Sequence, residues 1–268
     1  MSFKTILVPL SGTERDSAVI DVALQLGHEF KAHIEALYAK KEREERTVGE
    51  RTCFMDANHV RTFFANRCKS YASGRPGDKA LDGLSVNFKE LQGVEADLIA
   101  EHGRLADLIV LSHPSSSDTD WPSISIQTAL RETARPVLLV PQAARQLGKS
   151  NIIAWNGSLE ATRAVAFAIP ILLRGASTLV VTLGNHDIEP SGRKVVDYLK
   201  WHGIKAKNAI IPVENSSESS TLLAASFDAG ADLIILGAYT RYRTGRPAFG
   251  SMTKQMITQN KLPVLMAH

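Results

Sequence analysis

The chain carries two copies of one sequence pattern, and this duplication constrains its fold more than any other feature. Residues 106–112 read ADLIVLS, and residues 231–237 repeat them as ADLIILG. A helical stretch and then an apolar strand led by a proline follow each copy, with Pro136 in the first half and Pro263 in the second. Because a duplicated domain repeats its strands and turns even after its surface has diverged, the sequence predicts two domains built to one plan.

The starts of the two copies also correspond. Residues 6–13, ILVPLSGT, match residues 151–158, NIIAWNGS. A polar segment that carries Gly148 lies between the copies, as expected of a linker. The predicted domains are therefore residues 1–147 and 148–268, and a length of 268 residues also favours two domains of about 150 residues each.

Each half alternates short apolar strands with amphipathic helices. In the second half the strands are predicted near residues 151–155, 178–183, 207–213, 232–237 and 263–267. These strands are rich in Val, Ile and Leu and do not alternate with polar residues, which is typical of parallel strands buried on both faces. The predicted fold class is α/β, with two tandem doubly wound domains related by internal duplication, each holding a five-stranded parallel sheet.

Two helix starts carry capping signals. Thr13 with Asp16 three residues on resembles a capping box, and Ser158 is followed by Glu160 in the first turn. The first helix of each half is therefore predicted to begin just after these hydroxyls.

Charge and hydropathy exclude several classes of protein. Lys and Arg number 31 and Asp and Glu 28, so the net charge of +3 is too small to indicate a dedicated nucleic-acid surface. The longest apolar run, residues 164–173, has ten residues, whereas a helix needs about 20 to cross a bilayer. Residues 6–10 are interpreted as a first strand and not as a signal peptide. We expect a cytoplasmic protein with no nucleic-acid or membrane partner.

Open parallel sheets bind ligands beyond the carboxyl ends of their strands where the strand order reverses, here between the first and fourth strands. In the second half the first strand leads to Asn156, and the fourth leads from Gly237 towards Gly250 and Ser251. Glycines let the backbone approach a phosphate, and the amides at a helix start favour an anion. The same segment holds three arginines, Arg241, Arg243 and Arg246. These arginines either contact phosphate or belong to a solvated loop.

Familiar catalytic motifs are missing from the sequence. A Walker A motif fails because Phe249 and Met252 stand where the lysine and its spacing would be needed. GxGxxG, GxSxG, HExxH and EF-hand patterns do not occur, and the eight histidines are scattered. The sequence therefore predicts no catalytic residue and no metal site. Trp155 has two interpretations, a shelter for an adenine ring or a packing residue at a strand end.

With these features the chain resembles a tandem universal stress protein over nearly its whole length. The resemblance rests on ILVP at residues 6–9, the two ADLI strands, the two Pro-Val-Leu endings and the loop of the second half. ATP-binding members of that family carry Gly, two residues, Gly, nine residues and then Gly-Ser or Gly-Thr after the fourth strand. Gly237, Gly250 and Ser251 fall on that spacing, and Thr240 stands at the middle glycine.

The resemblance implies that the second half binds an adenine nucleotide, ATP or AMP, with Mg²⁺ as an accompanying ion. The strand ends and Asn156 would contact the adenine and ribose, and the loop and helix start would contact the phosphates. The residues implied are Ala154, Asn156, Leu183, Leu236, Gly237, Thr240, Arg241, Arg243, Gly250, Ser251 and Met252. The function expected is that of a stress-response regulatory protein with at most slow ATP hydrolysis.

The first half departs from the family pattern. Ser112, Ser115 and Ser125 stand at all three glycine positions, and Ser11 replaces the family's Asp. The Cβ of serine obstructs close backbone approach, so we expect no nucleotide there by the family mode. Asn156 stands at the corresponding Asp of the second half. That departure keeps open a second hypothesis, an interaction scaffold of the same fold that has lost nucleotide binding.

The resemblance also implies how the halves assemble. The strands led by Pro136 and Pro263 come last in their sheets, and an unpaired edge strand favours aggregation. Family members pair these strands across a two-fold axis, so the two halves are expected to pair with each other within one chain. A homodimer of the whole chain would then use other surfaces. An enzyme on this fold is a third hypothesis, for which the sequence offers no nucleophile or base.

Overall fold

The computed structural model describes the chain in several stretches. They are residues 2–40, 56–73, 83–114, 124–144, 147–184, 192–213, 216–238, 240–241, 247–248, 250–258 and 261–268. These residues form two compact units, one chiefly of residues 2–113 and 123–145 and the other chiefly of residues 146–268. The units are described separately below as the first and second domains.

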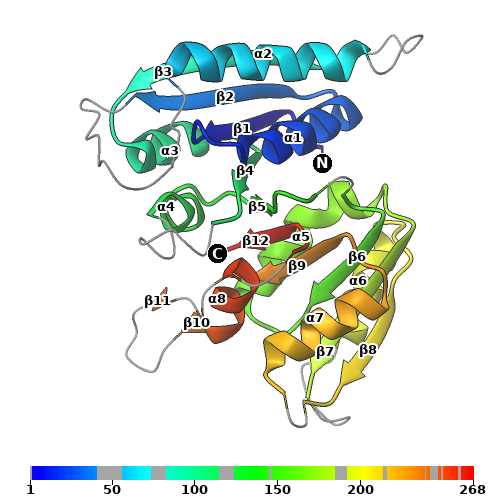
Figure 1. Cartoon of the computed structure of the whole chain (residues 1–268). Helices are drawn as coiled ribbons and strands as arrows, with labels where there is room; N and C mark the ends of the chain where they lie inside the picture. The colour runs from blue at the N-terminus through cyan, green and yellow to red at the C-terminus, as the bar shows by residue number, and fades with distance from the viewer. Residues whose placement is uncertain are drawn as a thin grey trace. The chain divides into compact units, whose positions relative to one another are not determined.

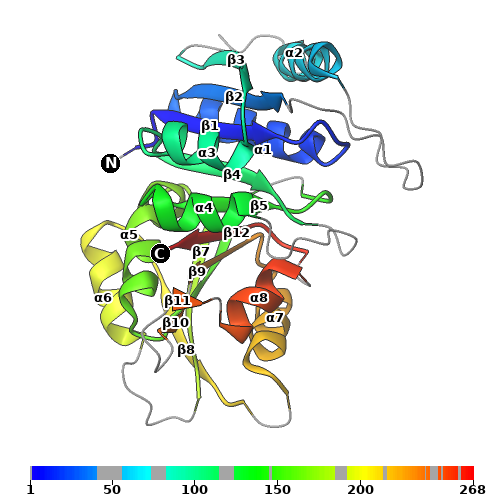
Figure 2. The ribbon, with the colours of Figure 1, turned by 90° about the vertical axis from the view of Figure 1, so that its left-hand side faces the viewer.

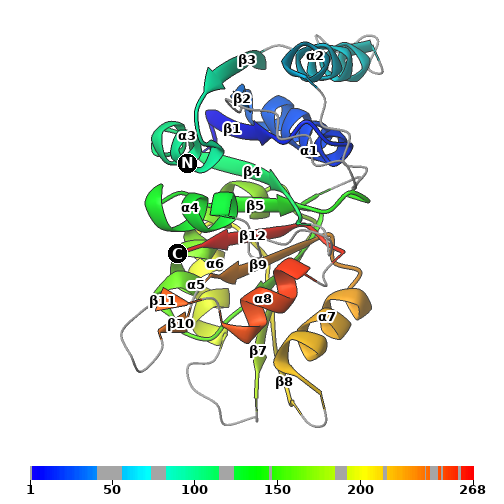
Figure 3. The ribbon, with the colours of Figure 1, turned by 60° about the vertical axis from the view of Figure 1, so that its left-hand side comes forward.

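The first domain is a five-stranded parallel sheet with helices on both faces (Figure 1). Its elements are β1 (Thr5–Leu10), α1 (Asp16–Phe30), β2 (His33–Lys40), α2 (Ala57–Ser73), β3 (Ser85–Gln92), α3 (Glu95–Gly103), β4 (Leu108–Ser112), α4 (Ile124–Glu132) and β5 (Val137–Val140). The strand order is β3-β2-β1-β4-β5, so the order reverses between β1 and β4. In Figure 3, α1 and α2 lie on one side of this sheet and α3 and α4 on the other.

The second domain repeats this plan. Its elements are β6 (Ser150–Ala154), α5 (Leu159–Leu172), β7 (Ser177–Leu183), α6 (Arg193–Trp201), β8 (Lys207–Ile211), α7 (Glu218–Asp228), β9 (Leu233–Gly237), α8 (Ser251–Thr258) and β12 (Val264–Ala267). The strand order is β12-β9-β6-β7-β8, and every pairing among these strands is parallel. Figure 2 shows α5 and α6 on one side of the sheet and α7 and α8 on the other. The predicted fold class is therefore confirmed.

The repeated aspartate ties the fourth strand of each sheet to the start of the first. Asp107 Oδ2 accepts hydrogen bonds from the backbone N–H groups of Lys4 (2.7 Å) and Thr5 (3.0 Å). The Asp232 carboxylate accepts three, from residues 148–150, at 2.9, 3.0 and 3.1 Å. An aspartate that receives several backbone donors satisfies groups that the sheet ladder leaves open. The repeated motif is thus a structural device for joining two strands.

The prolines before the last strands have a matching role. Ile109 donates its N–H to the Pro136 carbonyl at 3.1 Å, and Ile234 donates to the Pro263 carbonyl at 3.0 Å. Proline is tolerated just before a strand because its carbonyl still accepts, although it has no N–H to donate. The last strand of each sheet is buried along its whole length. These are the doubly buried parallel strands that the apolar runs predict.

One local prediction was wrong, and one pair of strands was not predicted. The first helix begins at Asp16 with Arg15 as its N-cap, and the Thr13 hydroxyl bonds to Ser11 Oγ at 2.7 Å in place of capping the helix. The third predicted strand, near residues 207–213, is confirmed as β8 and ends at Ile211. An antiparallel pair, β10 (Thr240–Arg241) with β11 (Pro247–Ala248), was not predicted.

The cap of the second domain's first helix was predicted correctly. Ser158 is the N-cap of α5, and its Oγ accepts a hydrogen bond from the Ala161 N–H at 3.0 Å. Glu160 lies in the first turn, where a negative charge favours the helix dipole. None of the helices that the structure describes is both long and apolar enough to span a membrane.

Candidate functional site

The strand ends that the sequence singles out meet at one edge of the second sheet. The strand order reverses between β6 and β9, which pair in parallel with Ile153 beside Ile235. β6 ends at Ala154, β7 at Leu183 and β9 at Gly237, so all three lie at the carboxyl edge of the sheet. This edge is where open parallel sheets bind their ligands.

The turn from β6 into α5 presents backbone amides with no internal acceptor. Gly157 has a φ of +74°, a conformation that favours glycine. Within the described stretches, no acceptor contacts the N–H groups of Asn156 and Gly157. Asn156 Oδ1 accepts from the Ser158 N–H at 3.1 Å, so this predicted ribose contact bonds to its own turn. The turn therefore offers donors to an anion.

Gly237 lies where the start of α5 packs on the end of β9. A Cβ on Gly237 would lie 2.5 Å from the Ala161 nitrogen and 2.7 Å from the Glu160 carbonyl carbon. Contacts this short do not occur in folded proteins, so any larger residue would push α5 away from the strand. The sequence argument attributed this glycine to phosphate approach, whereas the structure shows a packing reason.

The segment between β9 and α8 is only partly described. Thr240 and Arg241 form β10, so the backbone of Thr240 is extended there. Arg243 and Arg246, which the sequence places near the phosphates, lie outside the described residues. Gly250 is buried, and the helix ladder of α8 begins with the Lys254 N–H, which donates to the Gly250 carbonyl at 3.0 Å.

The first turn of α8 is a second source of free donors. Ser251 begins the helix and is exposed, and Met252 is half-buried. The N–H groups of Ser251, Met252 and Thr253 donate to no acceptor among the residues that the structure describes. The amides of a first turn carry the positive end of the helix dipole, which attracts anions.

Two buried polar atoms near the same edge also lack partners. Trp155 donates its backbone N–H to the Val181 carbonyl at 2.8 Å, but its indole Nε1 is buried with no acceptor among the described residues. The Thr182 hydroxyl, near the end of β7, is likewise buried and unpartnered there. A buried donor without an acceptor is costly, and both interpretations of Trp155, a shelter for an adenine ring or a packing residue, stay open.

The first domain fills the equivalent turn with a side chain. Gly12 has a φ of +73°, which matches Gly157, and α1 begins four residues later, at Asp16. Asp16 Oδ1 accepts from the Ser11 N–H (3.0 Å) and Oγ (2.8 Å), and Oδ2 accepts from the Gly12 N–H (2.8 Å). Asp16 is buried and only 2% exposed. Burial raises the pKa of Asp16, although these hydrogen bonds work in the opposite direction.

His113 follows β4 in the first domain and is 8% exposed. Its N–H donates to the Val140 carbonyl at 2.9 Å, as Ala238 donates to Ala267 at 2.8 Å in the second domain. Burial lowers the pKa of His113 to about 4, so the imidazole is neutral at physiological pH. Its Nε2 has no partner in the described part of the chain. The sequence indicated Asp16 only as part of a capping box, and neither its bonds to the turn nor the burial of His113 was predicted. Both residues stand where the second copy has an alanine.

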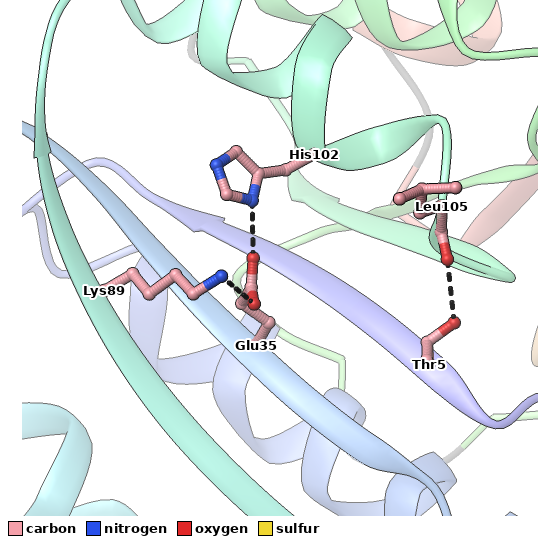
Figure 4. Close-up of polar contacts among 5 residues, drawn as sticks. All are labelled: Thr5, Glu35, Lys89, His102 and Leu105. Carbon is pink, nitrogen blue, oxygen red and sulfur yellow. Dashed lines mark hydrogen bonds and ion pairs between the residues drawn. The ribbon is translucent and has the colours of Figure 1, made fainter.

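A separate polar cluster joins β2, β3 and α3 in the first domain (Figure 4). Glu35 Oε1 lies 2.7 Å from His102 Nδ1, and Glu35 Oε2 lies 2.6 Å from Lys89 Nζ. Burial of Glu35 opposes ionisation, but the hydrogen bonds and charges of Lys89 and His102 outweigh it and lower the Glu35 pKa. Glu35 is the third residue of β2, far from its carboxyl end, so the cluster stabilises the fold and lies outside the candidate site.

No metal-binding group was found in the described stretches, where no three His, Cys, Asp or Glu side chains gather.

The carboxyl edge of the second sheet offers backbone donors, a hydroxyl and strand-end apolar side chains. Such a set suits a ligand that joins an anion to an apolar ring.

Comparison with solved structures identifies the fold. A universal stress protein from Archaeoglobus fulgidus DSM 4304 matches with a TM-score of 0.70 at 14% identity, over 98% of this chain and 97% of that one. A protein of unknown function from Pseudomonas aeruginosa PAO1 matches with a TM-score of 0.65 at 16% identity, over 98% and 92%. The chain therefore has the universal stress protein fold, with two such domains in tandem.

Other comparisons add little. A universal stress protein solved in complex with cAMP covers 53% of this chain at 16% identity with a TM-score of 0.40, which is too low to support an argument about ligands. No protein-family model and no curated protein matches the sequence. Any ligand of this chain must therefore be argued from its own residues.

Proposed function

We propose that this chain is a stress-response regulatory protein that binds an adenine nucleotide, ATP or AMP, through its second domain. The observation that carries the proposal is the set of unpaired amides at the carboxyl edge of the second sheet. Asn156 and Gly157 supply two of them and the first turn of α8 supplies three more, none with an acceptor among the described residues. Phosphate oxygens would satisfy such donors and the helix dipole together.

The strand ends supply the apolar surface that the adenine ring of a nucleotide needs. Ala154, Leu183 and Leu236 lie at or beside the carboxyl ends of three adjacent strands. We assign the adenine to these strand ends and the phosphates to Gly250, Ser251 and Met252 at the start of α8. The ring and the anion would then lie on opposite sides of the switch point, as in other nucleotide-binding α/β folds.

The remaining predicted contacts have distinct roles in this proposal. Asn156 would reach the ribose only by releasing the Ser158 N–H that its Oδ1 now accepts. Thr240, Arg241 and Arg243 belong to the segment that would cover the outer phosphates, and Gly237 keeps α5 close to β9. Mg²⁺ would accompany ATP through the phosphate oxygens, because no acidic cluster in the described stretches holds a metal alone.

The function proposed is binding, with at most slow hydrolysis. None of the described residues at the switch point of the second domain is a carboxylate or histidine paired with a nucleophile, as general-base catalysis would require. A regulatory protein needs only that the bound and free states differ, which binding itself provides.

One observation favours the alternative, a scaffold of the same fold without nucleotide. Asn156, the proposed ribose contact, already accepts from the Ser158 N–H, so the turn is satisfied in part without any ligand. Under this alternative the free amides would be hydrated, since Asn156 and Gly157 are exposed.

Thermal unfolding with ATP, ADP, AMP and cAMP separates the two functions. A ligand that binds only the native state stabilises it by RT ln(1 + [L]/Kd), so about 100-fold excess over Kd adds about 2.7 kcal/mol. The proposal expects a concentration-dependent rise in Tm with at least one of these nucleotides and no rise with adenosine alone. An unchanged Tm with all four at millimolar concentration would favour the scaffold.

A further inference from the structure

We propose that the first domain is closed to external anions by its own Asp16, whose carboxylate takes the turn amides that the second domain leaves free. The proposal explains why two copies of one fold would differ in ligand binding. It goes beyond the serine substitutions in the first domain's loop, because it assigns the closure to one buried side chain. It does not require the second domain to bind a nucleotide.

The two turns share the conformation of their glycine and differ in what fills them. Gly12 and Gly157 share a left-handed conformation, with φ of +73° and +74°. The repeat aligns Asp16 with Ala161 four residues later in each copy. Asp16 projects its carboxylate back onto the turn, whereas the methyl group of Ala161 cannot accept a hydrogen bond. A turn with the same glycine conformation therefore holds an internal carboxylate in the first domain and none in the second.

The hydrogen bonds of Asp16 are those an external anion would make. Its two oxygens accept the successive N–H groups of Ser11 and Gly12, at 3.0 and 2.8 Å, and the Ser11 hydroxyl at 2.8 Å. Successive backbone donors of this kind form the concave anion sites found in many phosphate-binding turns. With the carboxylate in place, these donors are used, and a second anion would also meet a buried like charge.

His113 fills the space beside the end of β4, next to the turn that Asp16 fills. It occupies the position of Ala238, as the matching hydrogen bonds to Val140 and Ala267 show. A buried imidazole therefore replaces a methyl group beside the switch point of the first domain. Asp16 and His113 of the first domain are thus larger and more polar than Ala161 and Ala238, the residues at the same positions of the second domain.

The test uses the full-length chain and inorganic phosphate as the probe. Backbone amide shifts of Ser11 and Gly12 are followed by NMR during a phosphate titration of the parent and of Asp16→Ala. We expect no saturable shift at these amides in the parent. In Asp16→Ala we expect saturable shifts, with phosphate affinity at least about tenfold higher than in the parent. The readout is local to the first domain, so it does not depend on the nucleotide proposal.

Glu14→Ala is the matched control. Glu14 is an exposed acid in the same turn, so its removal deletes the same charge without freeing any amide. A phosphate response in this variant equal to that of Asp16→Ala would overturn the proposal, because net charge alone would then explain the effect. Asp16→Leu, which fills a similar volume without an acceptor, replaces Asp16→Ala if the alanine variant does not fold.

Two further results would also overturn the proposal. One is a saturable response of Ser11 and Gly12 to phosphate in the parent, which would show that Asp16 does not close the turn. The other is a folded Asp16 variant, judged by its dispersed spectrum, whose amides stay silent. A silent parent with a responsive Asp16 variant and a silent Glu14→Ala supports it.

Discussion

Asp107 and Asp232 hold the same position in the two domains, and each accepts backbone hydrogen bonds from the start of its sheet's first strand. The hydrogen bonds join residues that are 103 positions apart in the first domain and 84 positions apart in the second. It gives the repeated ADLI motif a physical role in joining the fourth strand to the first. Loss of this carboxylate should therefore weaken either domain.

Asp232→Ala should lower the free energy of unfolding by about 2 kcal/mol, because three backbone donors, two of them partly buried, lose a charged acceptor. Urea unfolding followed by circular dichroism measures the change. Asp228→Ala is the control, since Asp228 is exposed at the end of α7 and should change stability by less than about 0.5 kcal/mol. Equal losses in the two variants would refute the role given to Asp232.

Gly237→Ala should destabilise the second domain by about 1 to 3 kcal/mol, since its Cβ would press on the backbone of Glu160 and Ala161. Gly230→Ala is the comparison. Gly230 has a φ of +59° and no atom near its Cβ position, so an alanine there is disfavoured only by the left-handed backbone conformation, at a cost of about 1 kcal/mol. Thermal melts of both variants decide the matter, and a smaller loss at Gly237 than at Gly230 would contradict the packing argument.

The Glu35 cluster should make stability sensitive to acid. The folded-state pKa of Glu35 is lowered, so its contribution is present above the unfolded-state pKa and is lost as pH falls through the folded-state value. We expect the stability difference between the parent and Glu35→Gln to shrink between about pH 6 and about pH 3. Urea titrations across that range measure it. A difference that grows towards low pH would contradict the assignment.

The pairing of the two domains stays a prediction from the family resemblance. Single cysteines introduced near Leu139 in β5 and Leu265 in β12 should cross-link within one chain at low protein concentration. The measurement is the mass of the product on a denaturing gel. Cross-linked products of only twice the chain mass would instead indicate pairing between separate molecules.

Much of the fold could be predicted from the sequence because its signals are local. Apolar runs without alternation indicate doubly buried strands. A serine just before an amphipathic run, such as Ser158, indicates a helix start whatever the tertiary context. Because the sequence is duplicated, strands and helices assigned in one half can be assigned at the matching positions of the other half. The β10–β11 pair was missed because each strand has two residues, too few for any periodicity.

The first-domain turn shows what local patterns leave open. An acid three residues after a threonine indicates a capping box, yet Asp16 bonds to Ser11 and Gly12 instead. The difference depends on where α1 begins, and helix boundaries are set by packing as much as by the residues themselves. Gly237 is similar, because spacing identified the glycine but only the position of α5 explains it.

Isothermal titration of ATP into the full-length chain tests the central claim most directly. We expect one binding site per chain, with binding that Gly250→Val abolishes and Ser251→Ala weakens by about 0.5 to 1.5 kcal/mol. Ser125→Val changes the corresponding position of the first domain and should leave the titration unchanged. Two sites per chain, or a parent that binds ATP no better than Gly250→Val, would contradict the account.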